Sequence, residues 1–521
     1  MYDGVQVVEI VLGREALWGL RNRNLLPMGS VIQLRNATLE DHSFRVGGGG
    51  TRLGDSFGAT VTGLAAIDFF ADVNTQRTVA SGDDGTIRKD NGSGAAWVNL
   101  VTGLTTSGQV PFFHVGGAET SGNSRKLFHL DRINAVRVLA ADGGSMTVIT
   151  APPAAWSGAN QPGFGVIHQG FHWAGGAAND GHRIHRSILA DHEDFTSTVY
   201  SLRVFPGDGE RLVAGLSYKG VLILWKYPVG LFAVDTSENS DANWRVIKVG
   251  APGAAGPSNV IAIEDDLMWV AADGTWHLLS ATTATGSVRA EDLAARKLGS
   301  WHRDNINLAR LAWAQMIFYS HKQEVLLACA GTGQTAKNRR LHMDLNRRTE
   351  LGERWIWWDR DRNESLFLRK KDEIHIPAMV DNVGQVWELD RSDRSAPAGT
   401  GFTFEFFLKD TDFSEIVPGW QGRWKNLRFI QLEYDARSAG TVTLEIYGDG
   451  SLLQTISQVL SAGPAALPQV LPFTLGTASL LVTPRRRLRG RARRFAARVT
   501  SSAANVDVSF TKLLVGLEPG E

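Results

Sequence analysis

Short apolar segments, separated by turn-forming residues, recur along the whole chain. Residues 211–216, 221–225 and 267–270 are rich in Val, Leu and Trp, and polar, glycine-bearing stretches separate them. Helical periodicity is scarce, with residues 289–298 as the best helical candidate and 308–317 ambiguous. An Asp-Gly pair readily adopts the positive φ angles that two-residue hairpin turns require. Such pairs stand at 84–85, 142–143, 208–209, 273–274 and 449–450. The pattern predicts an all-β protein made of antiparallel hairpins.

Four segments share one loose form, in which an apolar strand, a Gly/Asp turn and a second strand are followed by an aromatic residue. They are residues 67–97, 126–156, 203–225 and 260–276. Strand pairs that recur in this way are typical of a β-propeller, whose blades each hold four strands. Residues 81–86 also approach the Asp-box hairpin of sialidase-like propellers, which builds a turn and carries no chemistry. The number of blades stays open, because the segments share little identity.

The length and one change in composition predict the domains. A chain of 521 residues exceeds the roughly 250–300 residues at which single cores stop growing. Residues 391–401 are polar and contain Pro397, which is typical of a linker. Alternating strands are predicted after it, which favours a β-sandwich. We therefore predict an N-terminal extension or docking segment at 1–60 with a glycine joint at 47–50, a β-propeller at 61–395, and a C-terminal β-sandwich-like domain at 396–521.

The charges balance, with 54 basic and 54 acidic residues. A neutral chain gives no reason to expect a general nucleic-acid or membrane binder, and it favours association. Cys329 is the single cysteine and lies in an apolar run, so we expect a packed core thiol and no disulfide scaffold. No apolar stretch approaches 18 residues, and the N-terminus lacks a basic region followed by an apolar one. We expect neither a membrane span nor a secretion signal.

The sequence lacks the common catalytic and metal-binding motifs, so we expect no enzyme, no cofactor and no metal. There is no Gly-x-Ser-x-Gly, no Walker loop and no His-Glu-x-x-His. His182 and His185, near 191–194, would hold Zn²⁺ together on a helix but face opposite ways on a strand. Carboxylates at 264–266 and at 359 and 361 leave a glycosidase open, because its paired carboxylates are defined by geometry and not by spacing.

Two segments are candidate interaction sites. Residues 355–358 read Trp-Ile-Trp-Trp. On a strand Trp355 and Trp357 share one face, either as part of a buried core strand or as an aromatic anchor between subunits. Residues 485–494 hold seven arginines. On a strand five of them share one face, and Leu488, Gly490 and Ala492 occupy the other. The five are Arg485, Arg487, Arg489, Arg491 and Arg493.

An arginine row of this kind needs a counter-charge, since like charges repel at close range. DNA phosphate, a carboxylate-rich protein and solvent are the alternatives. We favour an acidic protein neighbour, because arginines that line a channel would retard the passage of DNA.

Three stretches resemble bacteriophage tail proteins of the nozzle or tail-hub type. The first runs from Asn-Leu-Leu-Pro-Met-Gly at 24–29 to Ser-Phe-Arg at 43–45. The second, at 184–226, contains Ile-His-Arg-Ser, Asp-Phe, Gly-Asp-Gly and a leucine-rich strand that ends in Trp-Lys. The third joins the arginines at 490–494 to Leu-Leu-Val at 513–515.

The resemblance implies a propeller-bearing homo-oligomeric ring, often a hexamer, that surrounds the DNA exit channel. It implies synthesis in the cytoplasm of a bacterial host, residence in the virion, and contacts with adaptor, tail fibre or tube proteins. Genomic DNA would pass through transiently. Two other functions stay open: a carbohydrate-active propeller hydrolase, and a propeller scaffold that binds other proteins or peptides.

Overall fold

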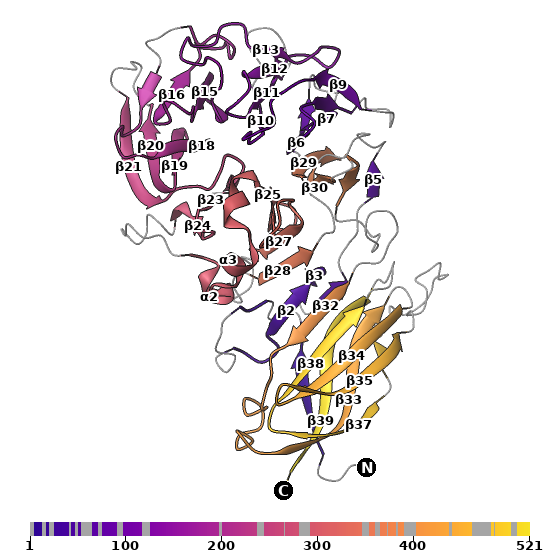
Figure 1. Cartoon of the computed structure of the whole chain (residues 1–521). Coiled ribbons are helices and arrows are strands. Elements are labelled where there is room, and N and C mark those ends of the chain that lie inside the picture. The colour runs from indigo at the N-terminus through magenta and orange to yellow at the C-terminus, as the bar shows by residue number, and fades with distance from the viewer. Residues whose placement is uncertain are drawn as a thin grey trace, which may run out of the picture.

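The computed structural model consists almost entirely of β-strands, arranged as a ring of small sheets above a two-layer sandwich (Figure 1). The structure describes residues 5–12, 17–19, 26–40, 43–46, 51–53, 65–70, 76–90, 97–116, 125–196, 201–236, 244–264, 266–280, 292–345, 354–359, 365–371, 374–381, 384–389, 403–436, 440–460, 481–483, 485–501 and 508–520. The predicted linker at 391–401 and the glycine joint at 47–50 lie outside these residues.

In the described residues seven blades form the ring, and the strands within each blade pair in antiparallel order. The first four blades contain β6 (Ala65–Phe70), β7 (Gln76–Ser81), β8 (Ile87–Lys89) and β9 (Val98–Val101); β10 (Phe112–Val115), β11 (Leu127–Leu130), β12 (Arg137–Leu139) and β13 (Thr147–Val148); β14 (Phe164–His168), β15 (Phe171–Gly175), β16 (Arg183–Arg186) and β17 (Ser201–Arg203); and β18 (Arg211–Tyr218), β19 (Val221–Tyr227), β20 (Val229–Asp235) and β21 (Arg245–Pro252). The last three contain β22 (Val260–Ile263), β23 (Asp266–Val270) and β24 (Trp276–Leu278); β25 (Gln315–Tyr319), β26 (Glu324–Cys329), β27 (Arg339–Asp344) and β28 (Arg354–Asp359); and β29 (Ser365–Lys371), β30 (Ile374–Val380), β31 (Val386–Glu388) and β5 (Thr51–Leu53).

The ring is closed. The first strand of each blade contacts the first strand of the next, and β29 of the last blade contacts β6 of the first. The outer strand of the last blade comes from the N-terminal part of the chain, because β5 pairs with β31 through Thr51 and Glu388. The chain is therefore a seven-bladed β-propeller whose final blade is completed by an N-terminal strand.

Aspartates shape several of the hairpin turns. In the first blade Asp84 accepts hydrogen bonds from the backbone N–H and hydroxyl of Thr86, at 3.1 and 2.6 Å. Asp273 makes the same two contacts with Thr275, also at 3.1 and 2.6 Å. The intervening Gly274 has φ of 83°, a conformation that favours glycine. These turns explain the Asp-Gly pairs at 84–85 and 273–274.

A two-layer sandwich follows the propeller. One layer contains β39 (Val508–Pro519) and β33 (Lys425–Ala436), with β1 (Gln6–Val11), β3 (Ala37–Glu40) and β4 (Ser43–Val46) on one side and β36 (Leu481–Val482) and β37 (Arg486–Ala492) on the other. The second layer contains β32 (Phe404–Leu408), β38 (Phe495–Ser501), β34 (Gly440–Gly448) and β35 (Ser451–Leu460). The first and last strands of the described chain, β1 and β39, pair with each other in the first layer.

The propeller and the sandwich share one nine-stranded sheet. In it β2 (Val31–Arg35) lies between β28 of the sixth blade and β32 of the sandwich. One hydrophobic core follows this sheet and includes Trp276, Trp355, Phe404 and Val515. All-β architecture with a propeller before a β-sandwich is thus confirmed.

The predicted N-terminal extension at 1–60 needs correction. Its described strands do not form a separate segment: β1 pairs with β39, β2 joins the two domains, and β5 completes the propeller. The physical reason is burial, since Leu34 and Phe44 have no exposed surface. Apolar strands of this kind are stabilised by the sheets that cover them.

The helices that lie wholly within the described residues are short and cluster after the fifth blade. They are α2 (Ala295–Leu298), α3 (Trp301–Asn305) and the 3₁₀ helix η3 (Leu308–Trp313). The helical candidate at 289–298 contains α2, and its residues 289–291 lie outside the described part. No helix in the described ranges is long and apolar enough to cross a membrane.

Candidate interaction surface

The arginine-rich strand β37 lies at one side of the sandwich and pairs with β33, where Lys425 is the partner of Ala492. Leu488 and Ala492 are buried, with 2% and 1% of their surface exposed. The predicted row of five arginines is exposed along its whole length, at Arg485, Arg487, Arg489, Arg491 and Arg493. The alternation expected of a strand is therefore observed, and the arginines point away from the core. We call these five residues the arginine row.

Aromatic rings support both ends of the arginine row. The guanidinium carbons of Arg491 and Arg493 lie 5.3 and 5.0 Å from the ring centre of Trp424, and 39% of the surface of Trp424 is exposed. At the other end Arg485 lies 4.7 Å from the ring centre of Phe429. Guanidinium groups at this range are attracted to the ring face. Trp424 directly precedes β33, so the pairing of β33 with β37 brings it beside Arg493, which local sequence spacing does not reveal.

The middle of the row has few intrachain counter-charges. Arg494, which follows the row, pairs with Asp410 at 3.2 Å, and Arg428 on β33 donates to Glu518 at 2.6 Å. Within the described residues no ion pair is recorded for Arg487 or Arg489. The chain contains no Asp or Glu between positions 450 and 506, so neither β37 nor the segment before it supplies a carboxylate.

The prediction that Trp355 anchors a subunit interface requires a correction. Trp355 has no exposed surface, and its ring meets that of Trp276 in the neighbouring blade edge-on, with centres 5.1 Å apart. Both edges of β28 are paired, to β27 and β2, which places this strand inside a sheet. Trp355 is therefore a core residue and not a surface anchor of the chain. The side chain of Trp357 lies outside the described residues, although its backbone pairs with Leu341.

The histidines are distributed over separate contacts. His182 lies 3.0 Å from Asp180, whereas His185 on β16 packs against Trp156 with ring centres 5.5 Å apart. His182 lies in the turn before β16 (Arg183–Arg186), and the two rings make separate contacts. Burial lowers the pKa of His185 to about 4. Across the described ranges, no three His, Cys, Asp or Glu side chains come together in an arrangement that could hold a metal ion.

A further pair of histidines, which the sequence did not indicate, lies between the second and third blades. His114 Nε2 and His172 Nε2 are 3.0 Å apart, and His172 Nδ1 lies 2.9 Å from the backbone oxygen of His192. Burial lowers the pKa of His172 to about 3 and that of His114 well below its ordinary value. Both rings are therefore neutral at physiological pH and serve as packed hydrogen-bonding groups.

The carboxylates noted in the sequence make structural contacts where they are described. Glu264 accepts a hydrogen bond from Gln323 at 2.6 Å. Asp266 is 7% exposed and accepts from the backbone N–H of Leu267 at 2.8 Å and from Ser280. The residues at 265 and 361 and the side chain of Asp359 lie outside the described part. Cys329 is buried in β26 with 1% of its surface exposed, as expected for a core thiol.

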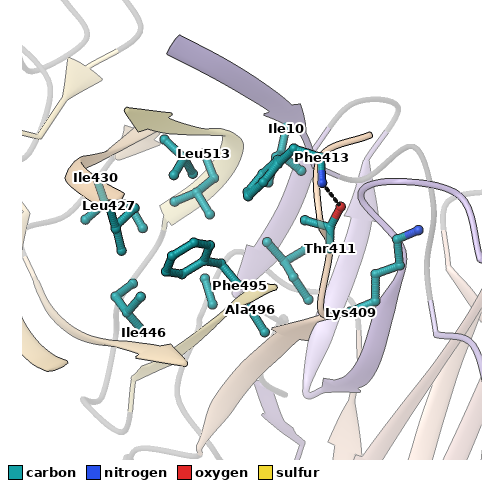
Figure 2. A pocket seen from close by; sticks show the side chains of 13 residues that line it. Ile10, Lys409, Thr411, Phe413, Leu427, Ile430, Ile446, Phe495, Ala496 and Leu513 are labelled. Carbon is teal, nitrogen blue, oxygen red and sulfur yellow. Dashed lines mark hydrogen bonds between the residues drawn. The ribbon is translucent and has the colours of Figure 1, made fainter. Parts of the chain in front are cut away.

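One apolar cavity lies between the two layers of the sandwich (Figure 2). Its volume is about 20 Å³, which is room for one or two water molecules. Side chains from both layers point into it, among them Leu427, Phe495 and Leu513. The cavity is too small for a substrate, so it is a packing gap of the core.

No protein-family model matches the chain, and no curated protein matches its sequence. Among solved structures, an exo-β-1,3-galactanase from Phanerochaete chrysosporium with β-1,3-galactotriose is similar over 90% of this chain and 99% of its own, with 9% identity and a TM-score of 0.31. YCF48 bound to D1 peptide matches 66% of this chain and 94% of its own, with 10% identity and a TM-score of 0.37. Raptor from Chaetomium thermophilum matches 66% of this chain and 30% of its own, with 10% identity and a TM-score of 0.37. All three scores are low, so the fold class rests on the sheet topology itself.

Proposed function

We propose that this chain is a non-enzymatic structural protein of a bacteriophage tail, which assembles into a ring around the DNA exit channel. The observation that carries the proposal is the nine-stranded sheet that runs from the sixth blade through β2 into the sandwich. A sheet of this kind makes the subunit one stiff, elongated body, because backbone hydrogen bonds and a common core cross the joint. Stiff subunits suit a particle that must keep its shape under load.

The sequence resemblance to nozzle and tail-hub proteins supports the tail assignment. Its most extensive stretch covers the third and fourth blades, from Ile184 on β16 to Lys226 on β19. In this proposal the ring contains several copies, often six, and contacts adaptor, tail fibre or tube proteins. The protein is made in the bacterial cytoplasm and resides in the virion, where genomic DNA passes through transiently.

The experiment is electron microscopy of the purified chain, combined with hydrolysis assays on a panel of polysaccharides. The proposal expects closed rings with a central pore and no turnover. Single propellers that hydrolyse a polysaccharide, with activity lost when one carboxylate pair is replaced, would establish the hydrolase alternative instead. Single propellers without turnover that bind peptides would favour the scaffold alternative.

A further inference from the structure

The arginine row is the strongest concentration of one charge that the sequence and structure present. Its side chains are exposed, and the aromatic rings of Trp424 and Phe429 hold three of the guanidinium groups close to the surface. Guanidinium groups that are already ordered lose less conformational freedom when they bind. The row is therefore prepared for a partner that presents several negative groups along a line.

The chain itself carries the complementary charge. Seven of its 54 basic residues lie at 485–494, where there is no acidic residue, so the rest of the chain has seven more acidic than basic side chains. Asp410 and Asp449 contact the end of the row at Arg493 and Arg494, whereas the described residues show no ion pair at its middle, at Arg487 and Arg489. The arginine row gives the subunit a basic face, and the rest of the chain carries an acidic excess. Identical subunits with this charge distribution can attract one another in a head-to-tail contact. Contacts of this heterologous type close into rings when the rotation permits.

We propose that the arginine row binds an acidic surface on a second copy of this chain and so forms one half of the ring contact. This inference rests on the proposed ring function. An exposed Trp flanked by arginines also fits a protein partner, since Trp and Arg are enriched where interfaces are strongest. Asp410 and Asp449 lie at the Arg494 end of the row. Their negative charges would repel a long polyanion such as DNA that continued past Arg494.

The test reverses charge in the middle of the row. In the full chain Arg487→Glu/Arg489→Glu changes two exposed arginines for which the described residues record no ion pair. Each close charge pair at an interface contributes about tenfold or more to the binding affinity. Loss of two such pairs should therefore weaken the affinity between subunits about a hundredfold or more. The matched control is Arg125→Glu/Arg203→Glu, which reverses two exposed arginines on the second and third blades. Oligomer mass and thermal melting are measured on each protein.

The outcomes separate the two proposals. Rings from the wild type and the control, but folded monomers from the row variant, support the inference. Rings from all three proteins overturn it and leave the ring function intact, whereas a monomeric wild type overturns the ring function itself. If the reversal variant does not fold, Arg487→Gln/Arg489→Gln replaces it and should weaken assembly to a smaller extent.

A DNA arm tests the competing partner. Binding of a short labelled duplex is followed against salt, where log K falls with a slope of about −0.9 per phosphate contacted. DNA binding that is lost in the row variant, while rings persist, would assign the row to DNA and overturn the protein contact.

Discussion

Arg35 on β2 and Trp357 on β28 are partners in a parallel register, and theirs is the one residue pair recorded for this strand contact in the described residues. The contact converts β28 from the outer strand of a blade into an inner strand of the nine-stranded sheet. On its other side β2 pairs with β32 through several residues, including Leu34 with Phe406. The propeller and sandwich are therefore coupled by an N-terminal strand that belongs to neither alone.

Replacing Leu34 with alanine should destabilise the whole chain in one step. Leu34 has no exposed surface and belongs to the core that contains both Trp355 and Phe404. Loss of a buried leucine side chain costs about 2–5 kcal/mol. Calorimetry should show one transition at a lower temperature. Val459→Ala, at a position 67% exposed on β35, should melt like the wild type. Two separate transitions, of which only one moves, would contradict the coupling.

Replacing Arg498 with leucine should destabilise the sandwich strongly. Arg498 Nε lies 2.5 Å from Glu405, whose side chain is 1% exposed, and Gln33 Nε2 donates to the same carboxylate at 3.0 Å. Without the arginine a buried negative charge loses its main partner, which costs about 3 kcal/mol or more. Urea unfolding of Arg498→Leu should show this loss, and Arg203→Leu, at an exposed position on β17 outside the row, should stay within about 0.5 kcal/mol of the wild type. Equal effects of the two changes would refute the assignment.

Stability should fall as the pH drops below about 6.5, where histidines of an unfolded chain bind protons. The pKa of folded His172 is about 3 and that of His185 about 4. Between about pH 6.5 and pH 4 the unfolded state therefore binds more protons than the folded state. The free energy of unfolding decreases as the pH falls through this range. His172→Gln should weaken this dependence, because it removes one of these low-pKa groups. Parallel curves for wild type and His172→Gln would contradict the prediction.

Local patterns were sufficient to predict the strands. The alternating strands predicted after the linker are present in the structure, among them β33 (Lys425–Ala436), β34 (Gly440–Gly448) and β38 (Phe495–Ser501). The motif that joins Asp208 to Lys226 also has a local explanation. The Lys226 side chain is fully buried and donates to Asp208 and, at 2.9 Å, to the backbone oxygen of Phe205. The ion pair anchors the Gly-Asp-Gly turn to β19.

Long-range pairing was beyond the reach of sequence patterns. Nothing near Thr51 or Val31 indicates that one pairs with Glu388 and the other with Leu408, because any apolar strand can extend any open sheet edge. Trp355 illustrates the same limit for the candidate site. The sequence pattern of a tryptophan on a strand is the same in a buried core and at an interface. The pairing of both edges of β28 shows that this strand lies inside a sheet. The arginine row was predictable because its alternation is local.

The native mass of the purified full-length chain, measured at low and at high salt, tests the central claim most directly. The account predicts a closed oligomer at low salt, with six copies of the 56.7 kDa chain as the expected form. It further predicts that this oligomer weakens as salt rises, because salt screens exposed charge pairs. A single 56.7 kDa species under every condition would contradict the account.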